Sequence, residues 1–242
     1  MIPTLARFAR VVAPDYFGFG RSDKPTARDF YTYERHYQSV ARLVAALDLR
    51  RLTLVVHDWG GPIGFRLAVE QPERVERLVV LNTGIFVEED RFPEAWFRFR
   101  EFVRRVGTEL RPGTLVKRSC ATPIADDVVA AYDAPYPVPE SKVGVVMFPE
   151  LVPAEPGPHP SAAAMRAVGE ALRRWTKPTL VLFSDADPIF TPDAAARLAG
   201  RIPGAGPAET VTGAAHFLQE DKGEEIAARV ATFIGRVAQP AR

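Results

Sequence analysis

Leu54-Val55-Val56-His57-Asp58-Trp59-Gly60-Gly61 is the stretch that decides the fold of this 242-residue chain. The apolar and β-branched residues at 52–56 predict a buried parallel strand. Two polar residues, an indole and two glycines end this strand, and a helical pattern follows at residues 62–71. A strand that passes through a sharp turn into a helix is the context that exposes a nucleophile at a strand tip. We therefore expect the carboxylate of Asp58 to lie at such a tip.

The rest of the chain alternates between strand and helix patterns. Further strands are predicted from apolar runs at residues 11–13, 77–82, 179–183 and 208–211. Helices are predicted at residues 33–47, 161–175, 193–200 and 221–237. This alternation predicts a mostly parallel sheet with helices on both faces, in which ligands bind at the carboxyl ends of the strands. Asp58 and Asn82 both fall at such ends.

The pattern changes between residues 85 and 160, where no clear strand occurs. An aromatic-rich helix is predicted at residues 93–106, and shorter helices at residues 125–132 and 139–147. We interpret this region as a helical cap placed over the strand ends. The predicted organisation is an α/β core formed by residues 1–84 and 161–242, with a cap formed by residues 85–160.

Composition excludes several partners. Thirty-one basic and thirty acidic residues leave a formal charge of +1, so neither nucleic acid nor an anionic membrane surface is expected as a partner. The lone cysteine, Cys120, excludes an internal disulfide and fits a reducing compartment, so we expect a cytoplasmic protein. No apolar run approaches the ~20 residues of a membrane span. The first ten residues do not have the pattern of a secretory signal.

Three polar residues fall in strand-end loops in the chain order Asp58, Asp187, His216, which is the order of nucleophile, acid and base in α/β-hydrolase enzymes. A carboxylate is already ionised at neutral pH and can displace a leaving group from an sp³ carbon. His216, oriented by Asp187, would then deprotonate a water that attacks the ester. Asp185 competes with Asp187 for the acid role, and Pro188, which fixes the chain after Asp187, favours Asp187.

Trp59 follows the nucleophile, and its indole N–H is a donor without acceptor function, which suits a halide. Its backbone N–H is placed to meet an anion. The alternative is a core tryptophan that packs under the cap. His57 should point away from Asp58, as neighbours along a strand do, and serve either to support the site residues from behind or in packing. His36 and His159 are expected to face solvent.

On these residues the sequence resembles the haloalkane dehalogenases of the α/β-hydrolase superfamily. The resemblance runs from Val11 to the C-terminus, and its specific pieces lie at residues 13–25, 57–61, 131–137, 187–188 and 213–217. The piece at residues 131–137, Ala-Tyr-Asp-Ala-Pro-Tyr-Pro, is the most discriminating, because the turn at residues 57–61 is shared with epoxide hydrolases. Asn82 resembles the subfamily that takes its acid from the later loop, which supports Asp187.

The resemblance implies a role for each site residue. Asp58 attacks the halogen-bearing carbon, His216 activates water, Asp187 supports His216, and Trp59 is one of two halide-binding groups. The implied substrates are a small haloalkane and water, and the halide is a product. The family needs neither a metal nor an organic cofactor.

The sequence departs from the family pattern at two places. The second halide-binding tryptophan of this subfamily lies on the first cap helix, where this chain has Phe99, with Trp96 three residues earlier. Phe99 has no N–H, although its positive ring edge can face an anion, and Trp96 lies almost one helical turn away. The family also begins with further strands and a His-Gly-x-Pro loop, which residues 1–10 do not match. We therefore expect an N-terminally truncated sheet with an exposed edge.

Two other functions remain open from the sequence. An epoxide hydrolase would use the same Asp-His-Asp machinery and needs tyrosines that donate to the epoxide oxygen, for which Tyr132 and Tyr136 are candidates. A truncated, non-catalytic hydrolase-like protein is the second, and the unmatched residues 1–10 are its main support.

Overall fold

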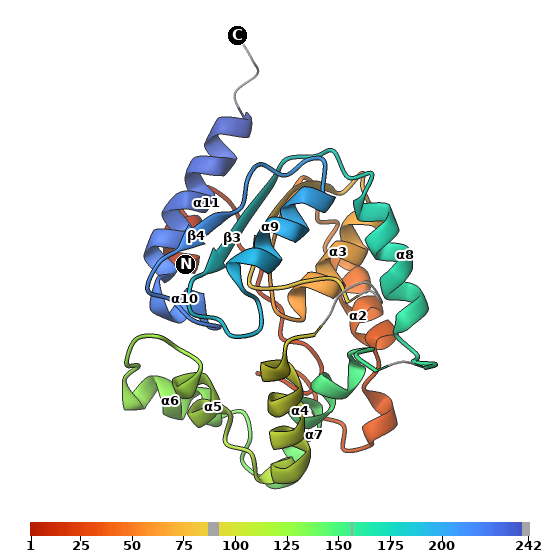
Figure 1. The fold of residues 1–242 in the computed structure, drawn as a ribbon, viewed down its shortest axis with the longest axis vertical. Helices are drawn as coiled ribbons and strands as arrows, with labels where there is room; N and C mark the ends of the chain where they lie inside the picture. The colour runs from red at the N-terminus through yellow and green to blue at the C-terminus, as the bar shows by residue number, and fades with distance from the viewer. Residues whose placement is uncertain (87–91, 156, 239–242) are drawn as a thin grey trace.

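The computed structural model describes residues 1–86, 92–155 and 157–238 (Figure 1). Its centre is a four-stranded parallel sheet with the strand order β1-β2-β3-β4. The strands are β1 (Leu52–His57), β2 (Val75–Leu81), β3 (Thr179–Ser184) and β4 (Glu209–Val211). The register pairs His57 with Leu81, and Leu81 with Leu182, so the first three strands end at one edge of the sheet. The four predicted strands from residue 52 onward are confirmed.

Helices cover both faces of the sheet because β2 is apolar on both of its faces. Leu78 and Val80 pack into the cluster formed with α3 (Gly60–Glu70), α8 (Ala162–Leu172) and α9 (Pro192–Arg201). Val79 and Leu81 face the other way, toward α1 (Ile2–Leu5), α10 (Leu218–Asp221) and α11 (Gly223–Ala238). Alternating side chains of one strand thus serve two cores, which explains why β2 reads as an unbroken apolar run.

The helix α2 (Tyr33–Ala46) packs on α3 and β1. The side chain of Thr32 accepts a hydrogen bond from the backbone N–H of Arg35, which is the N-cap that the sequence predicts. The hydroxyl of Tyr33 donates to the carbonyl of Pro62 at the start of α3. The predicted helices outside residues 85–160 are confirmed, and α3 begins two residues earlier than predicted.

The predicted strand at residues 11–13 is wrong. These residues form no ladder, and Val12 is 40% exposed. An apolar run becomes a strand only when a partner satisfies its backbone groups, and among the described residues no strand lies beside the outer edge of β1. Val55 in β1 is accordingly 39% exposed.

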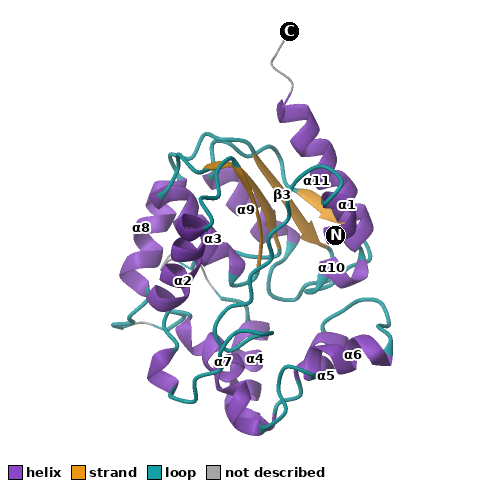
Figure 2. Ribbon diagram, turned by 180° about the vertical axis from the view of Figure 1, so that it is seen from behind, coloured by secondary structure: helices purple, strands orange, loops and turns teal. Residues whose placement is uncertain are grey.

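Helices α4 (Glu94–Val106), α5 (Pro112–Arg118), α6 (Asp126–Asp133) and α7 (Val143–Met147) lie together below the sheet in both ribbon views (Figures 1 and 2). The helix α5 is not predicted from the sequence. It packs so closely on α6 that a Cβ on Gly113 would meet the carbonyl oxygen of Val129. Short 3₁₀ turns occur at Arg28–Phe30, Gly107–Glu109, Pro139–Lys142 and Phe148–Leu151.

The described part of residues 85–160 contains no strand, as the prediction of a helical region requires. The predicted cap also includes residues 87–91 and 156, which lie outside the described residues. The division into a core and a cap therefore stays a prediction. None of the helices in the described ranges is long and apolar enough to span a bilayer.

Candidate active site

Asp58 lies in the sharp turn between β1 and α3, with a positive φ of 46° that non-glycine residues rarely adopt. Hydrogen bonds on both sides hold this turn. The Asp58 N–H donates to the carbonyl of Asn82 over 3.1 Å, and the Asp58 carbonyl accepts from the Gly61 N–H over 2.9 Å and from the Thr83 hydroxyl. A Cβ on Gly61 would lie 1.9 Å from the Thr83 hydroxyl oxygen, so the turn requires glycine there.

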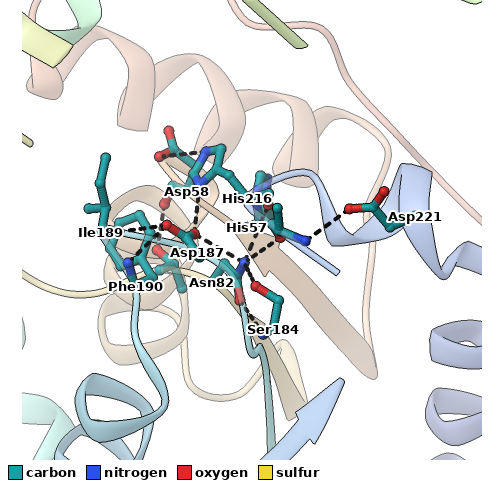
Figure 3. A network of polar contacts seen from close by, with 11 residues as sticks. His57, Asp58, Asn82, Ser184, Asp187, Ile189, Phe190, His216 and Asp221 are labelled. Carbon is teal, nitrogen blue, oxygen red and sulfur yellow. Dashed lines mark hydrogen bonds and ion pairs between the residues drawn. The ribbon is translucent and has the colours of Figure 1, made fainter. Parts of the chain in front are cut away.

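The structure brings Asp58, His216 and Asp187 together at the carboxyl end of the sheet (Figure 3). Asp187 follows β3, and His216 follows β4. Nδ1 of His216 lies 2.8 Å from Oδ2 of Asp187, and its Nε2 lies 3.6 Å from Oδ1 of Asp58. The side chain of Asp187 is fully buried, whereas that of Asp58 is 40% exposed. The buried carboxylate is thus placed to orient the imidazole, and the exposed one to meet a substrate.

The surroundings of Asp187 stabilise its charge. Burial alone would raise its pKa, but the hydrogen bond and charge of His216, with the backbone N–H groups of Ile189 and Phe190, lower it below its ordinary value. An ionised Asp187 accepts a hydrogen from Nδ1 of His216. The other ring nitrogen, Nε2, is therefore free to accept a proton on the side that faces Asp58.

The pKa of His216 is raised. Burial disfavours its charged form, but the hydrogen bond to Asp187 and the negative charges of Asp187 and Asp58 outweigh burial. The charged form of the His216 imidazole is therefore stabilised in this position.

Asn82 lies beneath this group and connects its loops. Its side-chain nitrogen lies 2.7 Å from the Ser184 hydroxyl, 3.1 Å from Oδ2 of Asp187 and 3.0 Å from the Ala215 carbonyl. Its side-chain oxygen accepts from the backbone N–H of Ser184 over 2.8 Å. One buried amide thus holds the loop that carries Asp187 and the loop that carries His216 to the sheet. Its position at a strand end marked Asn82 in the sequence, but its partners were not predictable from there.

His57 supports the main chain of His216. Its Nε2 lies 2.8 Å from the His216 carbonyl oxygen, which can only accept, so Nε2 carries the hydrogen. Burial, followed by the charge of His216, lowers the pKa of His57 to about 4, so the ring stays neutral at neutral pH. The sequence predicts a supporting or a packing role for His57, and it did not reveal that the supported group is the main-chain carbonyl of His216.

Asp185 and Asp187, the two candidates for the acid, differ in their contacts. Asp185 accepts hydrogen bonds from the backbone N–H groups of Gly213 and Ala214, which lie in the loop before His216. Among the described residues, Asp187 is the one of the two whose carboxylate contacts the ring of His216. Asp185 therefore holds the loop that precedes His216, and Asp187 is the carboxylate beside the His216 ring.

Trp59 is buried, and its ring packs edge-on against Phe86 and Phe148, with centroids 5.9 Å and 5.4 Å away. Its indole N–H and its backbone N–H are both hydrogen-bond donors, and the backbone N–H donates to no other backbone group within the described ranges. Both donors lie at the start of α3, where the helix dipole favours negative charge. Trp59 thus packs in the core, as the alternative interpretation holds, and also carries two donors in the residue that follows Asp58.

The ring contacts of Trp59 do not include either of the two predicted halide groups of α4 among the described residues. Trp96 is buried, with the ring of Phe92 5.0 Å away and the guanidinium of Arg100 4.7 Å from its ring centroid. Phe99 is half-buried. Within the described residues, no ring contact joins Trp59 to Trp96 or Phe99; Trp59 reaches α4 only through Phe86 and Phe92.

Tyr16 is a further neighbour of Asp58 that the sequence did not single out. Burial, followed by the negative charge of Asp58, raises the pKa of Tyr16. Its hydroxyl oxygen would lie 3.9 Å from a Cβ on Gly60, the second residue after Asp58. The only sequence feature that could have pointed to Tyr16 is its place directly after Pro14-Asp15, in the loop that follows the first apolar run.

The prediction that His36 faces solvent is wrong. His36 is 1% exposed and packs against the rings of Tyr16, Tyr31 and Phe148, and neither of its ring nitrogens has a hydrogen-bond partner among the described residues. Its position on α2 turns it toward the loop that precedes the helix, and burial lowers its pKa to about 4. His159 is also not free in solvent: it is half-buried, and its Nε2 lies 3.0 Å from the Glu150 carbonyl.

No cluster of three or more His, Cys, Asp or Glu side chains that could hold a metal ion occurs among residues 1–86, 92–155 and 157–238. The arrangement offers instead an exposed carboxylate, a buried carboxylate and an imidazole between them. These groups can carry out nucleophilic displacement followed by base-assisted hydrolysis.

Comparison with known proteins identifies the family. Residues 1–123 match the family model described as alpha/beta hydrolase fold. The chain is 42% identical to the haloalkane dehalogenase of Mycolicibacterium paratuberculosis, covering 93% of this chain and 74% of that protein. It is 43% identical to haloalkane dehalogenase 1 of Mycobacterium tuberculosis H37Rv, covering 96% of this chain and 77% of that protein.

The solved structures agree with these sequence relatives. The tetrameric structure of haloalkane dehalogenase DpaA from Paraglaciecola agarilytica NO2 superposes with a TM-score of 0.86 at 32% identity, over 95% of this chain and 76% of that chain. The crystal structure of a putative ancestral haloalkane dehalogenase, AncHLD2, superposes with a TM-score of 0.83 at 26% identity, over 98% and 85%. The chain therefore belongs to the haloalkane dehalogenase family, whose members are α/β-hydrolases acting on carbon–halogen bonds.

Proposed function

We propose that this chain hydrolyses haloalkanes in two steps through an alkyl ester on Asp58, with His216 as base and Asp187 as its acid partner. The observation that carries the proposal is the line of contacts from Asp187 through the imidazole of His216 to the exposed carboxylate of Asp58. Of these three side chains, only that of Asp58 bonds to the substrate in this proposal.

In the first step, an oxygen of Asp58 forms a bond to the halogen-bearing carbon. The carbon–halogen bond breaks, and its electron pair leaves with the halide. The departing anion is met by the indole N–H of Trp59 and by its backbone N–H, which donates to no other backbone group in the described parts of the chain. Donors aimed at the charge that develops in the transition state lower its energy most.

In the second step, Nε2 of His216 takes a proton from a water, whose oxygen attacks the carboxyl carbon of the Asp58 ester. The bond between the acyl carbon and the alkyl oxygen then breaks, and the alkoxide takes up a proton to leave as an alcohol. Asp187 stabilises the imidazolium in between. The balanced reaction is haloalkane plus water to alcohol, halide and a proton.

The halide site is proposed to consist of Trp59 and one residue of α4. Of the two candidates, Trp96 is engaged by Phe92 and Arg100, which leaves Phe99 as the position where a second group would act. In this proposal neither a nucleic acid nor a membrane takes part, and no cofactor is required. A cytoplasmic location is proposed from the lone Cys120.

Epoxide hydrolysis finds no support in the tyrosines that would have to assist it. The Tyr132 hydroxyl donates to Glu220 over 2.6 Å, and the Tyr136 ring lies beside the ammonium of Lys24. Across the described residues, no contact joins either tyrosine to Asp58.

Halide release from short bromoalkanes tests the proposal. The chain should release one halide per alcohol formed, and Asp58→Asn should abolish release because an amide is a poor nucleophile. His216→Phe should release about one halide per molecule and then stop, with the alkyl group retained on Asp58 and visible by intact mass spectrometry. A folded sample that releases no halide from a broad panel of bromo- and chloroalkanes would contradict the proposal.

A further inference from the structure

Asp221 joins two segments that lie far apart in the sequence. It ends α10, and its two carboxylate oxygens accept four hydrogen bonds. Three come from the α5–α6 connection: the Ala121 N–H (2.9 Å), the Thr122 N–H (2.8 Å) and the Thr122 hydroxyl (2.6 Å). The fourth comes from the N–H of Ala215 (2.9 Å), the residue before His216. One side chain thus ties the helix pair α5–α6 to the loop that carries the base.

The bonds of Asp221 are those of an ionised carboxylate. Burial would raise its pKa, but the Thr122 hydroxyl and the backbone N–H groups of Ala121, Ala215 and Thr122 lower it below its ordinary value. Every one of the four partners is a donor. Charge-assisted hydrogen bonds of this kind are about twice as strong as neutral ones, so Asp221 holds both segments firmly at neutral pH.

The base loop is held from two sides. On the side of the sheet, Asn82 and His57 contact the carbonyl oxygens of Ala215 and His216. On the side away from Asp58, Asp221 holds the N–H of Ala215 (Figure 3). Ala215, the residue that precedes His216, is therefore held on its N–H by Asp221 and on its carbonyl by Asn82.

Two other hydrogen bonds join the α5–α6 pair to this region at different residues. The Phe217 N–H donates to the Ser119 carbonyl over 3.3 Å, and Tyr132 donates to Glu220. Neither contact reaches the main chain of residues 215–216. In both ribbon views α5 and α6 lie next to α10 (Figures 1 and 2).

We propose that Asp221 is a positioning residue that sets the place of His216 from the α5–α6 pair, and thereby controls the second step of the reaction. This inference rests on the proposed function, in which His216 acts only after the ester has formed. Loss of the hydrogen bonds to Asp221 does not affect the β1–α3 turn that holds Asp58, so halide release continues. It lets the base loop move, so ester hydrolysis slows.

The experiment compares Asp221→Asn with wild type in a single turnover of a bromoalkane. Asparagine keeps one acceptor oxygen and puts an NH₂ group in place of the other. With the NH₂ group at the Oδ2 position, the N–H groups of Ala121 and Ala215 lose their acceptor; at the Oδ1 position it faces the Thr122 N–H and breaks the α5–α6 side of the contact. The halide burst should keep its rate within about twofold. Ester hydrolysis should slow by about tenfold to about a hundredfold, the range that a small misplacement of a catalytic group produces. The alkylated enzyme should then accumulate in intact mass spectra.

Two further variants make the result specific. Thr122→Val removes one of the four donors at nearly constant shape and should accumulate less ester than Asp221→Asn but more than wild type. Tyr132→Phe breaks a contact of the same helix pair that does not reach the base loop and should behave as wild type. Circular dichroism and thermal unfolding confirm the fold of each variant, and Thr122→Val decides the question if Asp221→Asn does not fold.

Several results would overturn the inference. One is a folded Asp221→Asn that hydrolyses its ester at the wild-type rate. Another is an equal loss in both steps without ester, which indicates a purely structural role. A third is Tyr132→Phe accumulating as much ester as Asp221→Asn. His216→Phe separates the two proposals: if it traps the ester and Asp221→Asn does not, only this inference fails. If His216→Phe forms no ester, the proposed function fails and this inference with it.

Discussion

Oδ2 of Asp187 lies 2.8 Å from Nδ1 of His216, and this distance fixes which nitrogen of the ring can act as a base. Asp187→Asn keeps the shape but offers either an NH₂ group or a neutral oxygen to Nδ1. We expect ester hydrolysis to fall by about three to four orders of magnitude, by analogy with the same change beside other catalytic histidines. The halide burst should remain. A burst lost together with turnover would contradict the assignment of Asp187 to the second step.

The pH dependence of ester hydrolysis follows from the raised pKa of His216. The base must be unprotonated, so the rate should fall as the pH drops through this raised pKa. Asp187→Asn removes the charge that raises the pKa and leaves the burial that lowers it. The acid limb of the residual activity should therefore move to lower pH, which a pH–rate profile measures. A shift to higher pH would contradict the electrostatic account.

Gly61→Ala should destabilise the turn that carries Asp58. Its Cβ would lie 1.9 Å from the Thr83 hydroxyl oxygen, and overpacking of this kind typically costs about 1–3 kcal/mol. Thermal and urea unfolding measure the loss. Gly200→Ala in α9 is the matched control, because no atom lies within 4 Å of its added Cβ. That variant should be neutral or stabilised by up to about 1 kcal/mol; equal losses in both would show that steric contact is not the cause.

Asn82→Asp should weaken the support of the acid. The change removes the amide hydrogens that reach Ser184, Asp187 and Ala215, and places a second negative charge near Asp187. A like charge raises the pKa of a carboxyl group. We expect a loss of about 1–3 kcal/mol in the free energy of unfolding at neutral pH and a slower ester hydrolysis. Asn82→Ser, which keeps a small donor and adds no charge, should lose less of both, and the reverse order would argue against the charge effect.

Phe99→Trp tests the place of the second halide group. If position 99 faces the anion, an added indole N–H should tighten bromide binding by about tenfold or more, since hydrogen bonds to charged groups contribute about 1.5–3 kcal/mol. Trp96→Phe is the comparison and should leave bromide affinity within about twofold. Product inhibition by bromide measures both. Loss of affinity in Trp96→Phe would place the second group at Trp96 instead.

The sequence was sufficient for the elements whose signals are local. The strands β1 and β2 follow from their apolar runs, and α2 follows from the N-cap at Thr32. The helix α5 was not predicted because it has only seven residues and contains Pro112 and Gly113. Residues 11–13 have the pattern of a strand, but pairing depends on a partner that no local pattern reports.

The site was predictable only in part. The chain order and the strand ends pointed to Asp58, Asp187 and His216, because parallel strands bring distant loops to one edge. The bonds of Asn82 and Asp221 join residues about a hundred positions apart, and their geometry depends on how the loops fold. His36 could not be placed either, since the rings that cover it come partly from a loop before its own helix and partly from Phe148.

The burial of His36 lowers the stability of the native protein at acid pH. Its imidazole lies among aromatic rings without an acceptor for either nitrogen, and its pKa of about 4 lies below the value of ~6.5 of an unfolded chain. At a pH between these two values, His36 is protonated in the unfolded chain and neutral in the native chain. Each unit of acidification in this window therefore favours unfolding by up to about 1.4 kcal/mol. A histidine that takes no part in the proposed reaction thus makes the native state sensitive to acid.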